Sequence, residues 1–400
     1  MPAQSHTRRG FSLIELLVVI AIIALLVGIL IPTIAGVRTT ARTAATEALM
    51  RDISIAATSF RNDTGRTPGY FSADEMGQQD NANTVGFTAM ENMLLDLAGG
   101  DAIVEDQPAT MDAFVEVGPY TEGSAENVWV NPGLLGTGSG SYWAPSSENV
   151  ATLGQESGND SQFGTATMGH VASAANPGAP VMPDIVDPFG APILAWVQNE
   201  TAGEPTELLD FARINSGVTP GDNQSLFYWG ANAGYLRANF IGSRGRDMTA
   251  RPDTLGENRK AASLIGGGAL ADIGATNDER MAGILSALLA NPSFLNTQID
   301  ISTNAAFNAP SDGASGIWPI RPRSTITLHS AGADNIFLEN SARAGQLGGG
   351  DPLGATPSPA GLSWKSLRYD VDGTARLDGD GRPTTVSISD FFDDVIITAD

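Results

Sequence analysis

The chain has 400 residues and is strongly acidic, with 45 acidic and 22 basic side chains and a formal net charge of −23. Such a surface repels nucleic acid and anionic lipid, whereas it suits divalent cations and solubility outside the cell. The absence of cysteine excludes disulfides, a thiol nucleophile and a Cys-ligated metal.

A long apolar run begins directly after Arg8 and Arg9. As a helix, residues 11–31 would be about 32 Å long at roughly 1.5 Å per residue, enough to cross a hydrocarbon layer of roughly 30 Å. The two arginines would keep the N-terminus on the cytoplasmic side and place the rest of the chain outside. The run contains one carboxylate, Glu15, and an unpaired charge at membrane depth is costly. Glu15 therefore predicts a specific partner that neutralises it.

The junction at the start of this run has the sequence Gly10-Phe11-Ser12-Leu13-Ile14-Glu15-Leu16-Leu17. It resembles the leader junction of type IV pilins and of the major pseudopilins of type II secretion. The resemblance implies cleavage after Gly10 by a membrane prepilin peptidase and N-methylation of Phe11. It also implies an inner-membrane assembly platform and other pilin-like subunits as partners.

The chemistry of assembly follows from these residues. Cleavage would leave a cationic amine on Phe11, and Glu15 would be the fifth residue of the mature chain. An amine and a carboxylate from neighbouring subunits would form an ion pair, and either group alone would be costly in lipid. Pro32 removes one backbone hydrogen bond, so we expect it to kink or locally melt the helix.

Two other interpretations of the N-terminus remain open. Residues 7–13 also resemble a twin-arginine export signal, with a small-residue cleavage site at Thr33-Ile34-Ala35. The segment could also be a plain signal anchor. Neither alternative gives Glu15 a role.

Beyond Pro32 we expect an amphipathic continuation of the helix over residues 32–64. Asn62, Gly65 and Pro68 provide the signals that end it. Small and apolar residues recur at three- and four-residue steps and predict a narrow, alanine-rich face that packs on a sheet. This face consists of Ile34, Val37, Ala41, Ala44, Ala45, Ala48, Ile55 and Ala56.

Residues 65–183 form a loop-rich insertion relative to short pseudopilins. It is rich in Gly, Ser, Asn and Ala. We expect one amphipathic helix over Thr88 to Leu97 and short strands around 114–117 and 128–130. The function of the insertion is not readable from its sequence, and a binding or adhesion module is one possibility.

Residues 184–400 are expected to hold the pilin-like sheet. Asp187-Pro188-Phe189-Gly190-Ala191-Pro192 predicts a turn that leads into a strand over 193–197, and it resembles the Asp-Pro-aromatic-Gly-x-Pro signature of major pseudopilins. Further strands are expected at 226–230, at 324–329 and in the tail 386–397. A helix is expected over Met281 to Ala290.

The turn expected at residues 330–335 resembles the calcium loop of major pseudopilins. Ser-x-Gly-Ala-Asp-Asn at 330–335 is followed much later by an acidic pair, and the resemblance makes Asp334, Asp393 and Asp394 candidate ligands. Clustered carboxylates suit calcium, which takes six to eight oxygen ligands. Solvent-exposed turn aspartates are the alternative. No cofactor is required, and a structural Ca²⁺ ion is the one that the sequence suggests.

The sequence shows no HExxH zinc motif, no nucleophile pattern and no phosphate loop, so we do not expect an enzyme. The predicted fold class is α+β, with a long N-terminal helix packed on an antiparallel β-sheet. After a leader over 1–10, the chain would be anchored by one transmembrane segment in the cytoplasmic membrane, with its globular part periplasmic or extracellular. The predicted function is a structural subunit of a pseudopilus or type IV pilus-like fibre. A minor or tip subunit that binds through its insertion, and a twin-arginine-exported soluble protein, are the alternatives.

Overall fold

A computed structural model describes residues 13–81, 85–110, 112–121, 123–151, 182–216, 224–232, 281–283, 285–286, 288–291, 294, 296, 318–334, 337–338 and 394–399. The predicted leader over residues 1–10 and residues 386–393 of the predicted C-terminal strand lie outside these ranges.

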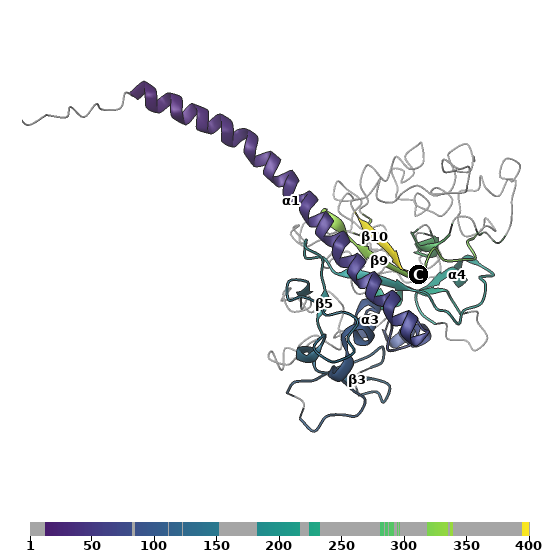
Figure 1. Ribbon diagram of the computed structural model, residues 1–400. Coiled ribbons are helices and arrows are strands. Elements are labelled where there is room, and N and C mark those ends of the chain that lie inside the picture. Colours follow the sequence, from purple (N-terminus) through teal and green to yellow (C-terminus); the bar gives the residue numbers. More distant parts are fainter. Residues whose placement is uncertain are drawn as a thin grey trace, which may run out of the picture.

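The architecture is α+β, as expected: a long N-terminal helix accompanies several small antiparallel sheets. Helix α1 spans Leu13–Thr64 and projects far from the globular body, whereas its second half crosses the body beside β9 and β10 (Figure 1). It ends where the stop signals lie, because Gly65 takes a left-handed conformation, φ +78°, that favours glycine.

The sheet that carries α1 has the strand order β10-β9-β6. These strands are Ile193–Val197 (β6), Ile326–Ser330 (β9) and Val395–Ala399 (β10). Both pairings are antiparallel, with Ala195 opposite Leu328 and Ile397 opposite Leu328 on the other side. The expected strands at 193–197, at 324–329 and in the C-terminal tail are therefore present and lie next to one another.

Smaller elements surround this sheet. The helices are α2 (Ala73–Met76), α3 (Ala89–Ala98) and α4 (Leu208–Phe211), and residues 281–283, 285–286 and 288–289 are also helical. One further sheet has the order β1-β3-β2, with strands Ile103–Val104, Val128–Val130 and Val115–Val117. The two-stranded sheets are β4 (Val150–Ala151) with β5 (Asp184–Ile185), and β7 (Ala212–Arg213) with β8 (Phe227–Tyr228), the latter parallel. The helix and strands expected in the insertion correspond to α3, β2 and β3.

The buried face of α1 differs from the predicted one. Its buried side chains include Met50, Ile53 and Phe60, which pack in one core with α3 and the sheet. Ala56 of the predicted face also lies in this core, whereas Ile34, Val37 and Ile55 are 53%, 68% and 65% exposed. The alanine-rich stripe was the wrong face because larger side chains bury more apolar area, and so determine which side of the helix meets the sheet.

Both faces of the β10-β9-β6 sheet are covered. Ile193, Leu328 and Val395 belong to the core beneath α1 and α3. Leu194, Trp196 and His329 alternate with the core-facing positions and are also fully buried, on the opposite face. The sheet is thus an internal layer, which makes it a firm support for α1.

Helix α3 begins with a reciprocal capping box. Thr88 N and Oγ1 both donate to Glu91 Oε2 at 2.8 Å, and Glu91 N donates back to Thr88 Oγ1 at 3.2 Å. Glu91 is buried, and burial raises the pKa of this carboxyl to about 7, although the Thr88 hydrogen bonds oppose the shift.

This raised pKa predicts that stability falls as pH rises. Between about 4.5 and about 7 the folded protein holds a proton that the unfolded chain has released, so each pH step in that window costs folding free energy. Glu91→Gln keeps the capping oxygen and removes the charge, so it should stabilise the protein at pH 8 by about 2 kcal/mol and have little effect at pH 4. Urea unfolding at both pH values measures this difference.

Glu75→Gln is the matched control. Glu75 occupies the same capping-box position in α2, opposite Ser72, but is only half-buried. Its substitution should change the unfolding free energy by less than about 0.5 kcal/mol at either pH. A Glu91→Gln variant that is less stable than the parent at pH 8 would contradict the assignment.

Candidate assembly site

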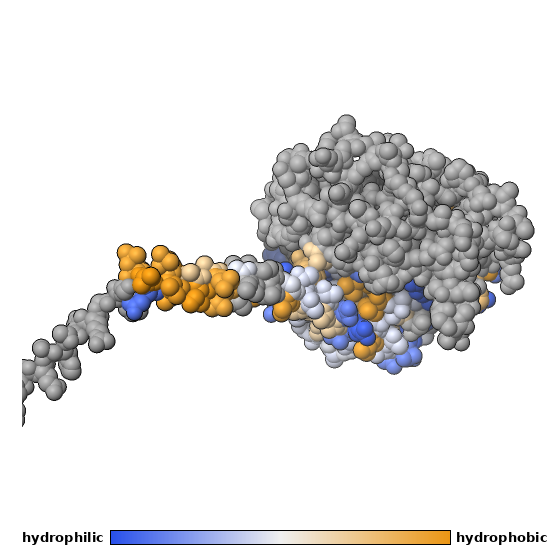
Figure 2. All heavy atoms as spheres, turned by 90° about the horizontal axis from the view of Figure 1, so that it is seen from above, coloured by the Kyte–Doolittle hydropathy of each residue, from blue (hydrophilic) through white to orange (hydrophobic). Residues whose placement is uncertain are grey.

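The projecting half of α1 exposes a continuous apolar surface. The large apolar side chains from Leu13 to Val27 are exposed, and Leu13 itself is 81% exposed. Figure 2 shows this surface as an orange rod outside the globular body. An apolar patch of this extent is a mark of a protein or membrane contact.

Glu15 is the only charged residue between Leu13 and Val37, and it lies in the first turn of α1. Its side chain is exposed, among the apolar residues of the projecting half. A carboxylate in a first helical turn interacts favourably with the helix dipole. Gly10 and Phe11, the predicted cleavage and methylation residues, lie outside the described residues, so the structure does not test their pairing with Glu15.

Pro32 lies inside α1, and the backbone is helical on both sides of it. The helix curves along its length (Figure 1). Of the two distortions expected at Pro32, local melting is not observed. Proline removes the hydrogen bond of one peptide group only, and the helix tolerates this loss without breaking.

Polar contacts at two points fix α1 on the body. Near its end, Arg61 Nη1 donates to Thr325 Oγ1 at 2.7 Å and Nη2 to Glu200 Oε1 at 3.2 Å. Nearer its middle, the Arg42 guanidinium lies over the Phe189 ring, 5.8 Å from its centroid. Phe189 belongs to the Asp-Pro-aromatic-Gly turn, so this turn contacts the helix as well as leading into β6.

The turn itself is organised by a buried carboxylate. Asp187 Oδ1 accepts hydrogen bonds from Phe189 N at 2.9 Å and Ala191 N at 3.0 Å, and Asp187 Oδ2 accepts one from Ser330 Oγ at 2.5 Å. Gly190, with φ +88°, completes the turn. Burial raises the pKa of Asp187, and these hydrogen bonds oppose the shift. The turn before β6 is thereby joined to the end of β9.

A second buried contact joins β9 to β10. His329 Nε2 lies 2.6 Å from Asp394 Oδ1, which also accepts a hydrogen bond from Leu338 N at 2.9 Å. Both side chains are fully buried, and the Phe337 ring meets the His329 ring edge-on at 5.0 Å. The sequence placed His329 on a strand, but its partner is 65 residues away, and no local pattern indicated the pair.

The candidate calcium residues are only partly described. Asp334 closes the short 3₁₀ turn Gly332–Asp334, its side chain is not described, and Asp393 lies outside the described residues. Asp394 Oδ1 is occupied by His329 and Leu338, and Oδ2 has no hydrogen-bond partner among the described residues. In the part of the chain that the structure describes, no cluster of three or more His, Asp or Glu side chains could hold a metal. The described candidate ligand, Asp394, supplies fewer than the six to eight oxygens that calcium takes, so calcium stays a prediction.

Residues 5–31 match a family model described as the prokaryotic N-terminal methylation motif. The chain carries a prepilin-type N-terminus. This motif is that of type IV pilin-like proteins and pseudopilins, and it includes Gly10, Phe11 and Glu15. No curated protein and no solved structure matches the chain.

The prepilin-type motif continues directly into α1. Within the described residues, none of the helices is both long enough and apolar enough to span a membrane. Part of the predicted span over residues 11–31 lies outside the described residues, so the span stays a prediction.

Because the His329–Asp394 contact is buried, we expect the substitutions of these two residues to have strongly non-additive effects on the free energy of unfolding. Replacing Asp394 by Ala should lower the unfolding free energy by about 3 kcal/mol, because it leaves His329 and the Leu338 N–H buried without a partner. His329→Ala should cost a similar amount, and the double variant much less than the sum of the two. Urea unfolding of the four proteins measures this cycle.

Thr398→Ala on β10, the strand that follows Asp394, is the control, since Thr398 is exposed and its substitution should cost less than about 0.5 kcal/mol. Additive effects of the His329 and Asp394 substitutions would show that the two side chains do not interact.

Proposed function

We propose that the protein is a structural subunit of a pseudopilus or type IV pilus-like fibre, processed by prepilin peptidase between Gly10 and Phe11. One observation carries this proposal. The prepilin-type motif continues into a helix whose first half exposes apolar side chains while its second half is built into the body.

The apolar half of α1 requires a partner that removes it from water. Burying one Leu, Ile or Val side chain contributes about 1.5–3 kcal/mol, and the projecting half exposes many of them. Before assembly the cytoplasmic membrane would provide this environment, with Arg8 and Arg9 on the cytoplasmic side and the body on the other. After assembly the helices of neighbouring subunits would replace the lipid.

Glu15 gives the assembly its register. Cleavage creates a terminal amine on Phe11, and the carboxylate of a neighbouring subunit's Glu15 would neutralise it. The ion pair forms at one axial offset between helices, whereas apolar contacts alone would allow several. The inner-membrane assembly platform and the other pilin-like subunits are the partners that this mechanism needs.

Two narrower roles follow from this proposal. A repeating shaft subunit would use α1 alone for its function, whereas a minor or tip subunit would also use the body to bind a ligand. The large body, with its insertion between α1 and β6, supports the second role. A twin-arginine-exported protein would lose α1 up to about Ala35 and would not form a fibre.

The processing site is directly measurable. Mass spectrometry of the mature protein from cells with prepilin peptidase should find an N-terminus at Phe11 carrying one N-methyl group. Cells that lack the peptidase should retain the leader. A mature N-terminus near Gly36 would contradict the proposal and favour the twin-arginine alternative.

Glu15→Gln should abolish incorporation into fibres because it removes the charge that pairs with the Phe11 amine. The sheared-fibre fraction should lose the protein by tenfold or more, while its amount in the membrane stays unchanged. Leu16→Ile, which alters only the shape of the adjacent side chain, is the matched control and should assemble normally. Normal incorporation of Glu15→Gln would contradict the pairing mechanism.

A further inference from the structure

Strand β6 lies at one edge of its sheet, and one of its residues has main-chain groups without a hydrogen-bond partner among the described residues. Gln198 N donates to Thr325 O at 2.9 Å, so the main-chain groups of Gln198 and of alternate residues before it face β9. In an antiparallel pair the residues between them direct N–H and C=O to the other side. The main-chain N–H and C=O groups of Ala195 and Val197 therefore face away from β9.

The neighbours of Val197 on this outer edge already have partners. Ala195 O accepts from Asn232 Nδ2 at 2.8 Å, and Asn199 N donates to Leu226 O at 2.8 Å. Between these two contacts, the Val197 main chain has no hydrogen-bond partner among the described residues. Within the described part of the chain, the Val197 N–H and C=O are therefore a donor and an acceptor without a partner.

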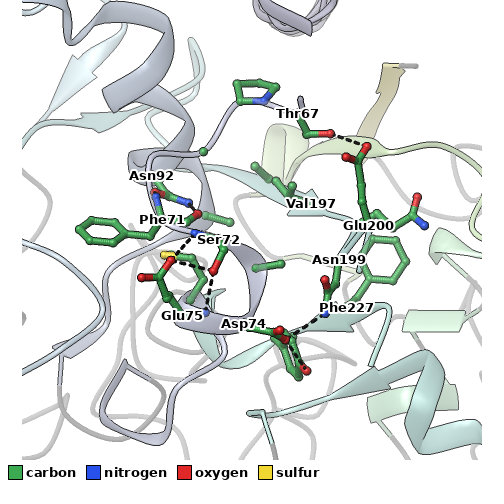
Figure 3. A pocket seen from close by; sticks show the side chains of 18 of the residues that line it. Thr67, Phe71, Ser72, Asp74, Glu75, Asn92, Val197, Asn199, Glu200 and Phe227 are labelled. Atoms are coloured by element: carbon green, nitrogen blue, oxygen red, sulfur yellow. Dashed lines mark hydrogen bonds between the residues drawn. The ribbon is translucent and has the colours of Figure 1, made fainter. Parts of the chain in front are cut away.

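A cavity of about 530 Å³ adjoins this position. Figure 3 shows Val197, Asn199 and Glu200 on one side of it and Phe71, Ser72 and Asp74 on the other. Two hydrogen bonds join the walls, Thr67 Oγ1 to Glu200 Oε1 at 2.9 Å and Asn199 Nδ2 to Asp74 Oδ1 at 3.0 Å. The volume is in the range of small-ligand sites, roughly 300–1,000 Å³.

The lining combines apolar surface with carboxylates. Met76 and Phe227 contribute apolar atoms, and Asp74 and Glu200 place carboxylates beside them. Tyr228 donates to Asp74 Oδ1 at 3.2 Å. Burial, with Asp74 beside it, raises the pKa of Tyr228 to about 12, so the phenol stays neutral at physiological pH.

The positive charges at this cavity are already neutralised. The Arg66 guanidinium forms two bonds to Asp96, at 2.6 and 2.9 Å, and Arg61 pairs with Glu200. Asp74 accepts hydrogen bonds from Asn199 and Tyr228 and has no basic partner among the described residues. With a net charge of −23 on the chain, an anionic ligand would be repelled. A ligand that carries a positive charge on an apolar stem matches the lining best.

We propose that this cavity binds one basic residue of an extended peptide, through a β-bridge to the Val197 main chain and an ion pair with Asp74. A residue in a β-bridge offers one N–H and one C=O on the same side, the complement of what Val197 offers. Its aliphatic stem would lie against the apolar lining. The inference does not depend on fibre assembly and would give the body a peptide-binding activity.

Saturation-transfer difference NMR on the full chain in detergent micelles tests this binding with synthetic tripeptides. The probe is acetyl-Ser-Lys-Ser-amide. One comparison peptide has norleucine in place of lysine, which removes the charge, and another has Nα-methyl-lysine, which removes the central N–H. The lysine peptide should bind saturably, and each comparison peptide at least tenfold more weakly.

Two protein variants locate the site. Asp74→Asn keeps an oxygen for Asn199 and Tyr228 and removes a charge, so it should weaken binding of the lysine peptide about threefold or more while leaving binding of the norleucine peptide unchanged. Ala73→Phe places a larger side chain on a wall residue and should abolish binding. Thermal unfolding confirms that each variant is folded, and the peptide comparison needs no variant at all.

Three results would overturn the proposal. They are no saturable binding of the lysine peptide, equal affinity for the Nα-methyl-lysine peptide, and unchanged binding to a folded Ala73→Phe variant. Equal affinity for a Glu-containing tripeptide would contradict the charge selection in the same way. None of these results would bear on the processing site or on Glu15, so the fibre proposal is tested separately.

Discussion

Burial of the second half of α1 against the β10-β9-β6 sheet is the contact on which the rest of this molecule depends. Met50, Ile53 and Phe60 have little or no exposed surface there, and Arg61 adds hydrogen bonds near the end of the helix. Because α1 is one unbroken helix, the packing of its second half on the sheet also determines where its apolar first half points (Figure 1). One helix therefore has one half inside its own body and another half whose apolar side chains are exposed.

The sheet can hold the helix because its strands are joined by buried polar contacts. Asp187 connects the turn before β6 to Ser330 at the end of β9, and Asp394 connects β10 to His329. Such contacts are costly to break when one partner is removed, so they favour a single register of the strands. Two of the acidic side chains of the chain are thus used inside the body for these specific connections.

Local patterns predicted much of this fold. The Asn-Gly-Pro signals marked the end of α1 at Thr64, Thr88 marked the start of α3, and alternation marked β9. The prepilin-type junction predicted the family motif that residues 5–31 match. The buried face of α1 could not be predicted, because the repeating alanines suggest one side of the helix and the fewer, larger side chains bury the other. The His329–Asp394 contact and the cavity at Val197 combine residues far apart in sequence, so no local pattern could indicate them.

In the proposed fibre the two halves of α1 have different partners, one within the subunit and one between subunits. Oxidative cross-linking of single-cysteine variants tests it directly, since the chain has no cysteine of its own. Leu16→Cys lies on the exposed half and Ile53→Cys on the buried half. In cells that assemble the fibre, Leu16→Cys should form disulfide-linked dimers, whereas Ile53→Cys should remain monomeric. Dimers through Ile53→Cys, with none through Leu16→Cys, would show that the exposed half of α1 is not the contact between subunits.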